Sequence, residues 1–193
     1  MTDKAASLME RIRDLEAELE EEFERRRALI HYEVQRGRVV FEQDIARKHA
    51  ELRQKLLPYL GGARLSVVLT APVIYAMIVP FVILDLFVTV YQAICFPAYQ
   101  IEKVQRSAYI TYDRQHLSYL NGLEKLNCVY CAYGNGILAY ATEIAGRTEK
   151  RWCPIKHAKR LASVHRHYSE FLEYGDAEAY REKQTAKAGT PQD

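Results

Sequence analysis

The stretch Leu65–Tyr99 reads LSVVLTAPVIYAMIVPFVILDLFVTVYQAICFPAY, and it decides the fold. Of its 35 residues, 27 are apolar, and Asp85 is its one acidic or basic side chain. Apolar runs of about 18 residues or more are typical of membrane helices. The run follows 64 mostly polar residues and lacks a basic start and a small-residue cleavage site, so it does not have the form of a signal peptide. The sequence therefore predicts a membrane anchor over residues 65–99.

The length of this run leaves two arrangements open. A straight helix of this length would rise about 52 Å, whereas the hydrocarbon core of a bilayer is about 30 Å thick. A single span would place about Val73–Ile94 in lipid, with Tyr75, Tyr91 and Tyr99 at or near the interfaces. A re-entrant hairpin would break near Pro80, because proline removes a helix hydrogen bond and clashes with the preceding turn.

The charges that flank the run favour the hairpin. Each side has three basic residues close to the run: Arg53, Lys55 and Arg64 before it, and Lys103, Arg106 and Arg114 after it. Membrane orientation follows an asymmetry of basic residues, and this balance places both flanks on the cytoplasmic side.

Asp85 is costly inside a bilayer, by at least about 2.5 kcal/mol. It is either a functional ligand or proton carrier, or a residue at a hairpin turn or on a protein-facing side of the helix. We favour the second interpretation.

Residues 1–64 have 13 basic and 13 acidic side chains and form a charged arm. Its apolar residues recur at helical spacing, and the sequence from Ser7 to Glu10 fits a capping box. Gly37 interrupts the pattern and Pro58 ends it, so we expect one long bent helix or an antiparallel helical hairpin hinged at Gly37. The stripe needs burial, so we expect self-association or a protein partner through residues 8–56. The stripe comprises Leu8, Ile12, Leu15, Leu19, Phe23, Ile30 and Val34, then Phe41, Ile45, Lys48, Leu52 and Leu56.

Cysteines and a histidine recur at short spacings after the apolar run. Cys128 and Cys131 form a C-x2-C pair, and Cys153 and His157 form a C-x3-H pair. Three thiolates and one imidazole are the ligands of a structural zinc site. The two pairs can meet only if the helix between them ends early, and we expect Gly146 to end it.

Two other roles for these cysteines remain open. Cys128, Cys131 and Cys153 could ligate an iron–sulfur cluster or do redox chemistry, or all could be ordinary reduced cysteines, as we expect for Cys95. Glu143 and Glu149 could orient His157 or act as acid and base. The alternative, which we favour, is that both are solvent-exposed carboxylates that pair with Arg147, Lys150 or Arg151.

The end of the chain is mildly basic. We expect a helix from Pro154 to about Tyr174, whose basic residues could contact anionic headgroups or simply face solvent. A short polar helix follows over residues 176–187, and residues 188–193 are expected to be disordered. The basic residues are Lys156, Lys159, Arg160, His165, Arg166 and His167.

The block CVYCAYGNG, EIAGRTE and WCPIKHA, between Cys128 and Ala158, resembles a group of uncharacterised bacterial membrane proteins. The resemblance covers roughly residues 65–181 and implies a bacterial inner-membrane setting, without an activity. Signatures of nucleotide-binding sites, zinc proteases and serine hydrolases do not occur in the sequence.

We therefore expect an all-α protein of four parts: a coiled-coil arm (1–64), a membrane anchor (65–99), a cytoplasmic helical module (100–187) and a tail (188–193). Its expected function is a membrane-anchored, zinc-stapled interaction or assembly module with no catalytic residues. The alternative is a membrane-associated redox or iron–sulfur enzyme. The net charge of +2 is too small to indicate a nucleic-acid partner.

Overall fold

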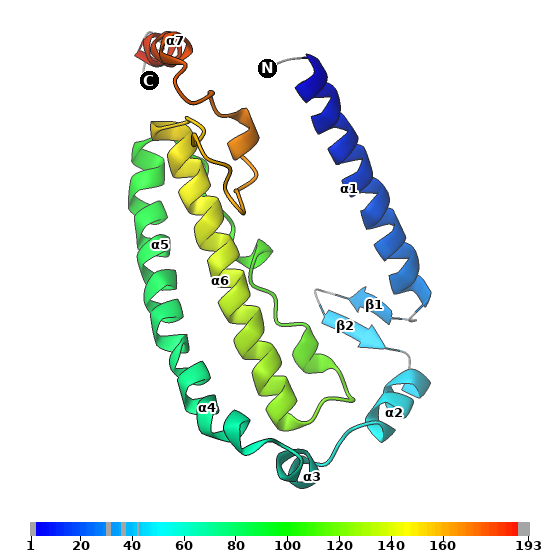
Figure 1. The fold of residues 1–193 in the computed structure, drawn as a ribbon. Helices are drawn as coiled ribbons and strands as arrows, with labels where there is room; N and C mark the ends of the chain where they lie inside the picture. The colour runs from blue at the N-terminus through cyan, green and yellow to red at the C-terminus, as the bar shows by residue number, and fades with distance from the viewer. Residues whose placement is uncertain (1–2, 30–31, 36–37, 42, 189–193) are drawn as a thin grey trace. The chain divides into compact units, whose positions relative to one another are not determined.

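The computed structural model describes residues 3–29, 32–35, 38–41 and 43–188, and these are mainly helical, as predicted (Figure 1). They form two compact units: residues 1–63 with 113–128, and residues 64–112 with 129–193. The α-helices are α1 (Asp3–Leu29), α2 (Gln43–Glu51), α3 (Leu56–Gly61), α4 (Leu65–Ala76), α5 (Ile78–Ala98), α6 (Gly122–Trp152) and α7 (Ala177–Ala188). Two strands, β1 (Tyr32–Gln35) and β2 (Arg38–Phe41), and three 3₁₀ turns, Arg106–Ala108, Arg114–His116 and Tyr168–Glu170, complete the list.

Helix α1 confirms the first half of the predicted arm as a helix. Its charged side chains pair along the helix, as between Arg26 Nε and Glu22 Oε1 at 3.1 Å. The apolar stripe is exposed along its length, with 61% of Leu15 and 43% of Phe23 accessible to solvent. The coiled-coil partner that the stripe predicts stays a prediction.

The second half of the arm differs from the prediction. Val34 and Phe41, which we expected on helices, lie in the antiparallel strands β1 and β2, where Val34 pairs with Val39. The strand sequences are rich in β-branched and aromatic residues, which favour a pleated backbone over the helix that the spacing of Val34 and Phe41 indicated. The expected hinge at Gly37, like Ile30 of the stripe, lies outside the described residues.

The predicted stop at Pro58 is also displaced. Helix α2 ends at Glu51, and Pro58 lies in the first turn of α3, where a missing backbone N–H costs nothing. In the same unit Arg53 Nε donates to the Ser118 carbonyl at 2.8 Å. Asn121 caps the start of α6. Its Oδ1 accepts from the backbone N–H groups of Leu123 and Glu124, and its backbone N–H donates to Glu124 Oε2 at 2.8 Å.

Helices α4 and α5 follow one another in a single run, and the run does not turn back on itself (Figure 1). The expected hairpin break near Pro80 is therefore wrong. Met77 joins the two helices with right-handed helical dihedral angles, φ −63° and ψ −12°. Pro80 falls in the first turn of α5, a position that tolerates proline.

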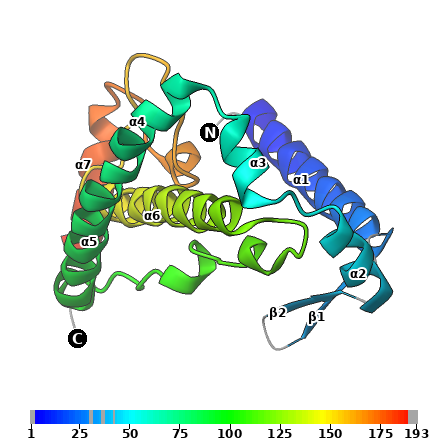
Figure 2. The ribbon, with the colours of Figure 1, turned by 90° about the horizontal axis from the view of Figure 1, so that it is seen from below.

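Helix α6 runs parallel to α4 and α5, and the irregular segment after α5 carries the chain back to the start of α6 (Figures 1 and 2). Three hydrogen bonds set this order: the Tyr130 hydroxyl to the Ile74 carbonyl at 2.7 Å, Tyr133 to Asp85 at 3.0 Å, and Tyr91 to Thr148 at 3.1 Å. A residue near the end of α4 thus meets the early part of α6, and a residue late in α5 meets its last turns, as in parallel helices.

The core of this unit lies between α5, α6 and the irregular segment that joins them. The segment over residues 99–112 packs Val104 and Ile110 against the helices. It approaches α6 at Gly136, where an added Cβ would lie 2.7 Å from the Tyr109 carbonyl oxygen. The buried cluster comprises Phe96, Val104, Ile110, Ile137, Tyr140 and Ile144.

Gly146 does not end a helix, and that prediction is wrong. It lies inside α6, where an added Cβ would meet the His165 ring at 2.8 Å. The predicted helix from Pro154 to Tyr174 is wrong as well, because this segment is irregular and folds back with Leu172 N–H donating to the Pro154 carbonyl at 2.8 Å. Helix α7 confirms the predicted polar helix. Residues 189–193 of the expected disordered tail lie outside the described residues.

Candidate membrane-facing surface and its polar support

One side of the α4–α5 run is apolar and exposed. The run is long and apolar enough to cross a membrane, and none of its most apolar stretch is buried. Its charged residue, Asp85, is turned inward and is only 15% exposed. The exposed large side chains are Leu65, Val67, Val68, Leu69, Val73, Ile74, Met77, Val79, Val82, Ile83, Leu86, Phe87, Val90 and Ile94.

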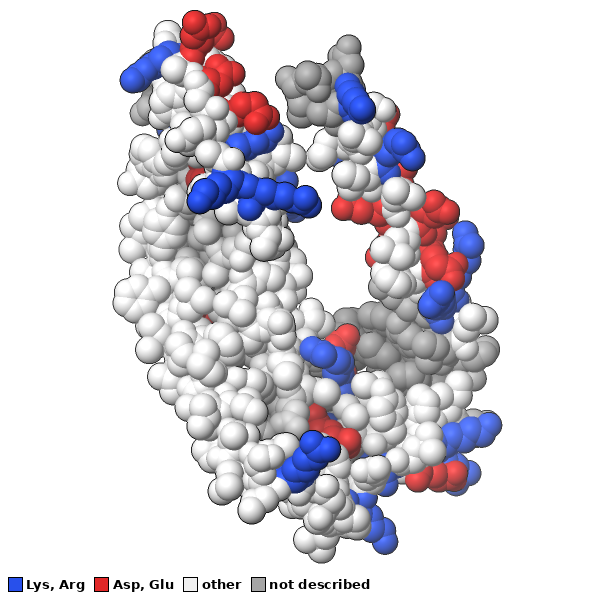
Figure 3. Space-filling view, viewed as in Figure 1, with Lys and Arg blue, Asp and Glu red and all other residues white. Residues whose placement is uncertain are grey.

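The exposed side of α6 continues this uncharged surface. Between Cys131 and Ala145 its exposed residues are small, apolar or amide and hydroxyl side chains. The polar ones bond within the helix: Asn135 donates to the Cys131 carbonyl at 2.9 Å, and Thr142 donates to the Leu138 carbonyl at 2.8 Å. Figure 3 shows few charged side chains over α4, α5 and α6, whereas charged side chains gather toward the end where α7 lies.

The opposite side of the helix pair is charged. Arg106, on the segment after α5, forks onto Asp85: its Nη2 lies 2.6 Å from Oδ2, and its Nε lies 3.1 Å and 3.2 Å from the two oxygens. Such paired contacts are the strongest form of an arginine–carboxylate interaction. The Arg106 side chain is 43% exposed. Asp85 therefore lies on a protein-facing side of the helix, as we favoured, and its partner is an arginine.

Tyr133 of α6 also contacts Asp85. Its hydroxyl donates to Asp85 Oδ2 at 3.0 Å. Burial, followed by the hydrogen bond to the Asp85 carboxylate, raises the pKa of Tyr133. The hydroxyl therefore keeps its proton at neutral pH, and it remains a donor to the carboxylate.

Gln92 of α5 holds the irregular segment in place. It accepts from the Val104 N–H at 2.9 Å and donates to the Val104 carbonyl at 3.2 Å, as a neighbouring strand would. Its amide also bonds to the Tyr140 hydroxyl. Both side chains are buried, so each of these polar groups has a partner inside the core.

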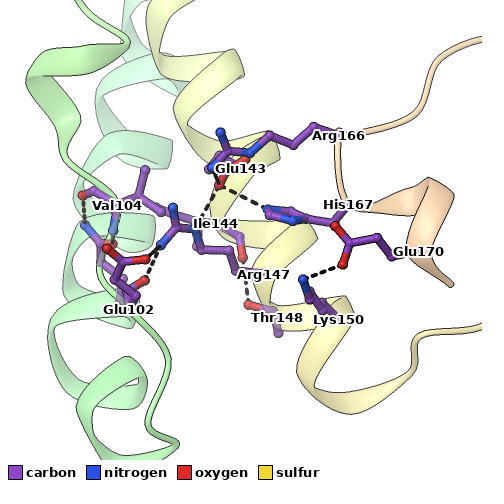
Figure 4. Close-up of polar contacts among 11 residues, drawn as sticks. Glu102, Val104, Glu143, Ile144, Arg147, Thr148, Lys150, Arg166, His167 and Glu170 are labelled. Carbon is purple, nitrogen blue, oxygen red and sulfur yellow. Dashed lines mark hydrogen bonds and ion pairs between the residues drawn. The ribbon is translucent and has the colours of Figure 1, made fainter. Parts of the chain in front are cut away.

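Glu143 is buried and lies at the centre of an ion cluster (Figure 4). Its Oε1 accepts from Arg147 Nε at 2.8 Å, from Arg166 Nη2 at 2.5 Å and from His167 Nε2 at 3.1 Å. Burial alone would raise the pKa of the Glu143 carboxyl, but hydrogen bonds from Arg147, His167 and Arg166 bring it below its ordinary value. Glu143 thus joins the irregular tail to α6 as an ionised carboxylate.

Glu149 makes a second contact between α6 and the tail. Its Oε2 lies 2.9 Å from His165 Nε2, and the His165 ring rests on Gly146. Glu143 pairs with Arg147, one of the partners that the alternative to an acid–base role named, but it is buried and not exposed to solvent, and Glu149 contacts His165 instead of a lysine or arginine.

The structure does not bring the four predicted zinc ligands together. Helix α6 is continuous from Cys131 to Trp152, which amounts to about 30 Å of rise at about 1.5 Å per residue. Cys153 therefore lies too far from Cys128 and Cys131 for the three to ligate one zinc ion or one iron–sulfur cluster. His157 stacks on Tyr168 with ring centroids 6.2 Å apart. Within the described residues, no group of three or more His, Cys, Asp or Glu could hold a metal ion.

Sequence reasoning missed three residues that organise this unit. Arg106 was counted only as a flanking charge, and Gln92 and Tyr140 were not singled out. A signal was available for Gln92, because it is the one amide in an apolar run and a buried amide needs partners. The positions of its partners, 12 and 48 residues along the chain, follow only from the tertiary structure.

Comparisons with family models, with curated proteins and with solved structures find no match to this chain.

Proposed function

We propose that this protein is a membrane-anchored helical module that assembles through its N-terminal arm. The exposed apolar side of α4 and α5 carries the proposal. Fully burying one large aliphatic side chain is worth about 1.5–3 kcal/mol. Burial of the exposed parts of these fourteen side chains would therefore contribute on the order of 10–20 kcal/mol of favourable free energy. Surfaces of this size on a soluble chain mark a contact with a membrane or a protein.

Lipid is the occupant that the surface fits best. The α4–α5 run spans 34 residues without an exposed acidic or basic side chain, and α6 extends the same character sideways. At the end of the run, Tyr99 and Trp152 pack edge to face with ring centroids 5.0 Å apart. Tyrosine and tryptophan are enriched where a bilayer meets water.

The charged side of the helix pair argues for helices that lie along the bilayer surface. The irregular segment beside α5 exposes Glu102, Lys103 and Arg106. Irregular backbone and exposed charges are not tolerated against hydrocarbon. If α5 crossed the bilayer, this segment would lie at membrane depth. We propose that the apolar side lies in the bilayer, the segment faces water, and both flanks stay on the cytoplasmic side of a bacterial inner membrane.

Helix α1 supplies the assembly surface. Its stripe of leucine, isoleucine and phenylalanine is exposed, and oppositely charged side chains flank it along the helix. A surface with both signs of charge is complementary to a second copy of itself. We propose that two copies pair through α1, and that cross-linking of the full chain in membranes yields a dimer that Leu15→Asp removes.

Vesicle flotation tests the membrane contact. Full-length protein synthesised in the presence of neutral phosphatidylcholine vesicles is expected to float with them. The double variant Ile83→Asn/Phe87→Asn, on the exposed side of α5, is expected to float in a smaller fraction than the wild type. Leu161→Asn/Val164→Asn removes two exposed apolar side chains from the tail, 41% and 50% exposed against 51% for Ile83 and 69% for Phe87, and is the control. Equal flotation of the two double variants would contradict the proposal.

Cysteine labelling tests the orientation. In a variant without its native cysteines, Gly61→Cys and Lys103→Cys each place one thiol at an end of the apolar run, on exposed positions. A membrane-impermeant maleimide is expected to label both sites in inverted membrane vesicles and neither in right-side-out vesicles. Labelling of the two sites from opposite sides would show a span across the bilayer and would overturn the in-plane arrangement.

A further inference from the structure

A basic cavity opens at the end of the α5–α6 pair, beside the ion cluster of Glu143. Its volume is about 480 Å³. Four separate segments of the same unit line it: the residues after α5, the last turns of α6, the tail, and α7. The lining residues are Gln100, Ile101, Glu102, Arg147, Lys150, Arg151, Arg166, His167 and Lys183.

The cavity has more positive than negative charge. Its lining contributes two lysines and three arginines, and its one lining carboxylate, Glu102, lies 3.4 Å from Arg147. Two carboxylates outside the lining also form ion pairs with these cations. Glu143 pairs with Arg147 and Arg166, and Glu170 Oε2 lies 2.6 Å from Lys150 Nζ. Five permanent cations thus face three carboxylates. Among these groups the cations outnumber the carboxylates by two, before any charge on His167 is counted.

The backbone at the end of α6 partly repels an anion. The end of α6 carries about half a negative charge from its unpaired carbonyl groups. Lys150 and Arg151 lie in this last turn and compensate it. Among the groups named, five cations face three carboxylates and this half charge, so the site favours a ligand with a concentrated negative charge.

The donors indicate which anion fits. Arginine guanidinium groups bind phosphate through paired N–H groups, and lysine binds it as a compact charge. The cavity volume lies in the range of small-molecule sites, about 300–1,000 Å³, and accommodates more than a bare phosphate ion. A phosphate ester with a small polar substituent meets both requirements.

The position of the cavity relative to the proposed membrane surface indicates the source of that ester. Arg151, which lines the cavity, places its Cζ 5.4 Å from the centroid of the Trp152 ring. Trp152 in turn packs on Tyr99, at the end of the apolar run. The cavity therefore lies at the level where we place the headgroups. We propose, resting on the membrane contact above, that it binds the phosphate headgroup of an anionic phospholipid.

Trp152 gives this proposal a direct optical readout, because it is the only tryptophan in the chain and lies beside the cavity. Full-length protein in a non-ionic detergent at fixed salt is titrated with phosphatidylglycerol, and separately with phosphatidylcholine of the same chains. We expect a saturable change of Trp152 fluorescence with phosphatidylglycerol and none with phosphatidylcholine. Inorganic phosphate alone, up to millimolar concentration, is expected to leave the fluorescence unchanged.

Two double variants with the same loss of charge locate the site. Arg166→Gln/Lys183→Gln removes two cavity cations, and Glu143 keeps Arg147 and His167 as partners. Lys159→Gln/Arg160→Gln removes two exposed cations of the tail outside the cavity. We expect the half-saturating fraction of phosphatidylglycerol to rise about tenfold or more in the first variant, since each surface cation contributes roughly fivefold to anionic-lipid binding. The second variant is expected to shift it less than twofold.

The proposal is overturned by a titration that does not saturate, by equal shifts in the two double variants, or by an equal response to inorganic phosphate. The flotation experiment uses neutral vesicles and does not depend on the cavity. Flotation with no phosphatidylglycerol response would therefore reject the headgroup site alone, whereas loss of flotation would reject the membrane contact.

Discussion

Arg106 Nη2 lies 2.6 Å from Asp85 Oδ2, near the middle of the most apolar run of the chain. The contact joins an irregular segment to a helix that otherwise exposes hydrocarbon. Asp85 keeps its charge on the side of α5 that faces the protein, so the opposite side is free of acidic and basic residues. This ion pair therefore gives the helix pair its two different sides.

Removal of one partner of this pair is expected to destabilise the unit. Arg106→Gln leaves the Asp85 carboxylate with the Tyr133 and Thr89 hydroxyls, and we expect a loss of about 1–2 kcal/mol in the free energy of unfolding, discounted because Arg106 is 43% exposed. Chemical unfolding in detergent measures it. Asp85→Asn/Arg106→Gln is expected to lose less than the two single changes together. Lys103→Gln is the control, and an equal effect there would show that the pair contributes nothing specific.

Gln92 is expected to determine the stability of the irregular segment. Gln92→Leu removes the two hydrogen bonds to Val104 and leaves the Val104 backbone groups buried without those partners. The expected cost is about 1–3 kcal/mol. Hydrogen exchange at the Val104 amide should accelerate by about tenfold or more, since 1.4 kcal/mol corresponds to a factor of ten. Gln105→Leu, at an exposed position of the same segment, should leave that amide unchanged.

Two glycines of α6 are expected to respond oppositely to alanine. A Cβ at Gly136 would lie 2.7 Å from the Tyr109 carbonyl oxygen and 2.8 Å from an Ile110 side-chain carbon, so Gly136→Ala should destabilise the unit by about 1–3 kcal/mol. A Cβ at Gly122, at the start of the same helix, would meet nothing within 4 Å. Gly122→Ala should be neutral or stabilising, by up to about 1 kcal/mol. Thermal unfolding of both variants gives the comparison, and equal midpoints would contradict the close packing at Gly136.

Local composition was sufficient to predict the apolar run, α1 and α7. These elements depend on residues close in sequence: an uninterrupted apolar segment, a helical stripe, and a polar stretch rich in helix-forming residues. The inward placement of Asp85 was also favoured, because a charge that faced lipid would cost too much. Its partner could not be predicted, because Arg106 is one of several cations near the run and only the path of the segment selects it.

Gly146 shows why the predicted zinc site depended on an ambiguous signal. A glycine after an apolar stretch is typical of a helix end, and also of a close approach between two segments. The sequence supports both readings equally, and the metal hypothesis needed the first. In the structure a neighbouring ring, that of His165, occupies the space where a side chain would be. Gly146 thus marks a close approach between two segments, and α6 continues past it, so Cys128 and Cys131 lie apart from Cys153.

Acid is expected to loosen the tail from α6. The pKa of Glu143 is lower in the folded protein than its ordinary value of 4.5, so the ionised carboxylate stabilises the fold at pH values above 4.5. That contribution is lost as the pH falls from 4.5 through the folded-state pKa. The thermal midpoint of the wild type should therefore drop over this range, and Glu143→Gln, already less stable at neutral pH, should drop less. Parallel pH profiles of the two proteins would contradict this role for Glu143.

Two native cysteines are expected to report which part of α6 contacts lipid. Cys131 lies on the uncharged exposed side of α6, and Cys153 lies just beyond its end, so both are exposed in the absence of a membrane. Cys95 and Cys128 are half-buried and are replaced by alanine for the measurement.

On vesicles, a water-soluble maleimide should modify Cys153 at least about ten times faster than Cys131, because bilayer contact excludes the reagent from an apolar surface. Denaturant should make the two rates equal, which controls for intrinsic reactivity. If Cys131 on vesicles reacts as fast as Cys153, the exposed side of α6 faces water, and the lipid contact is confined to α4 and α5.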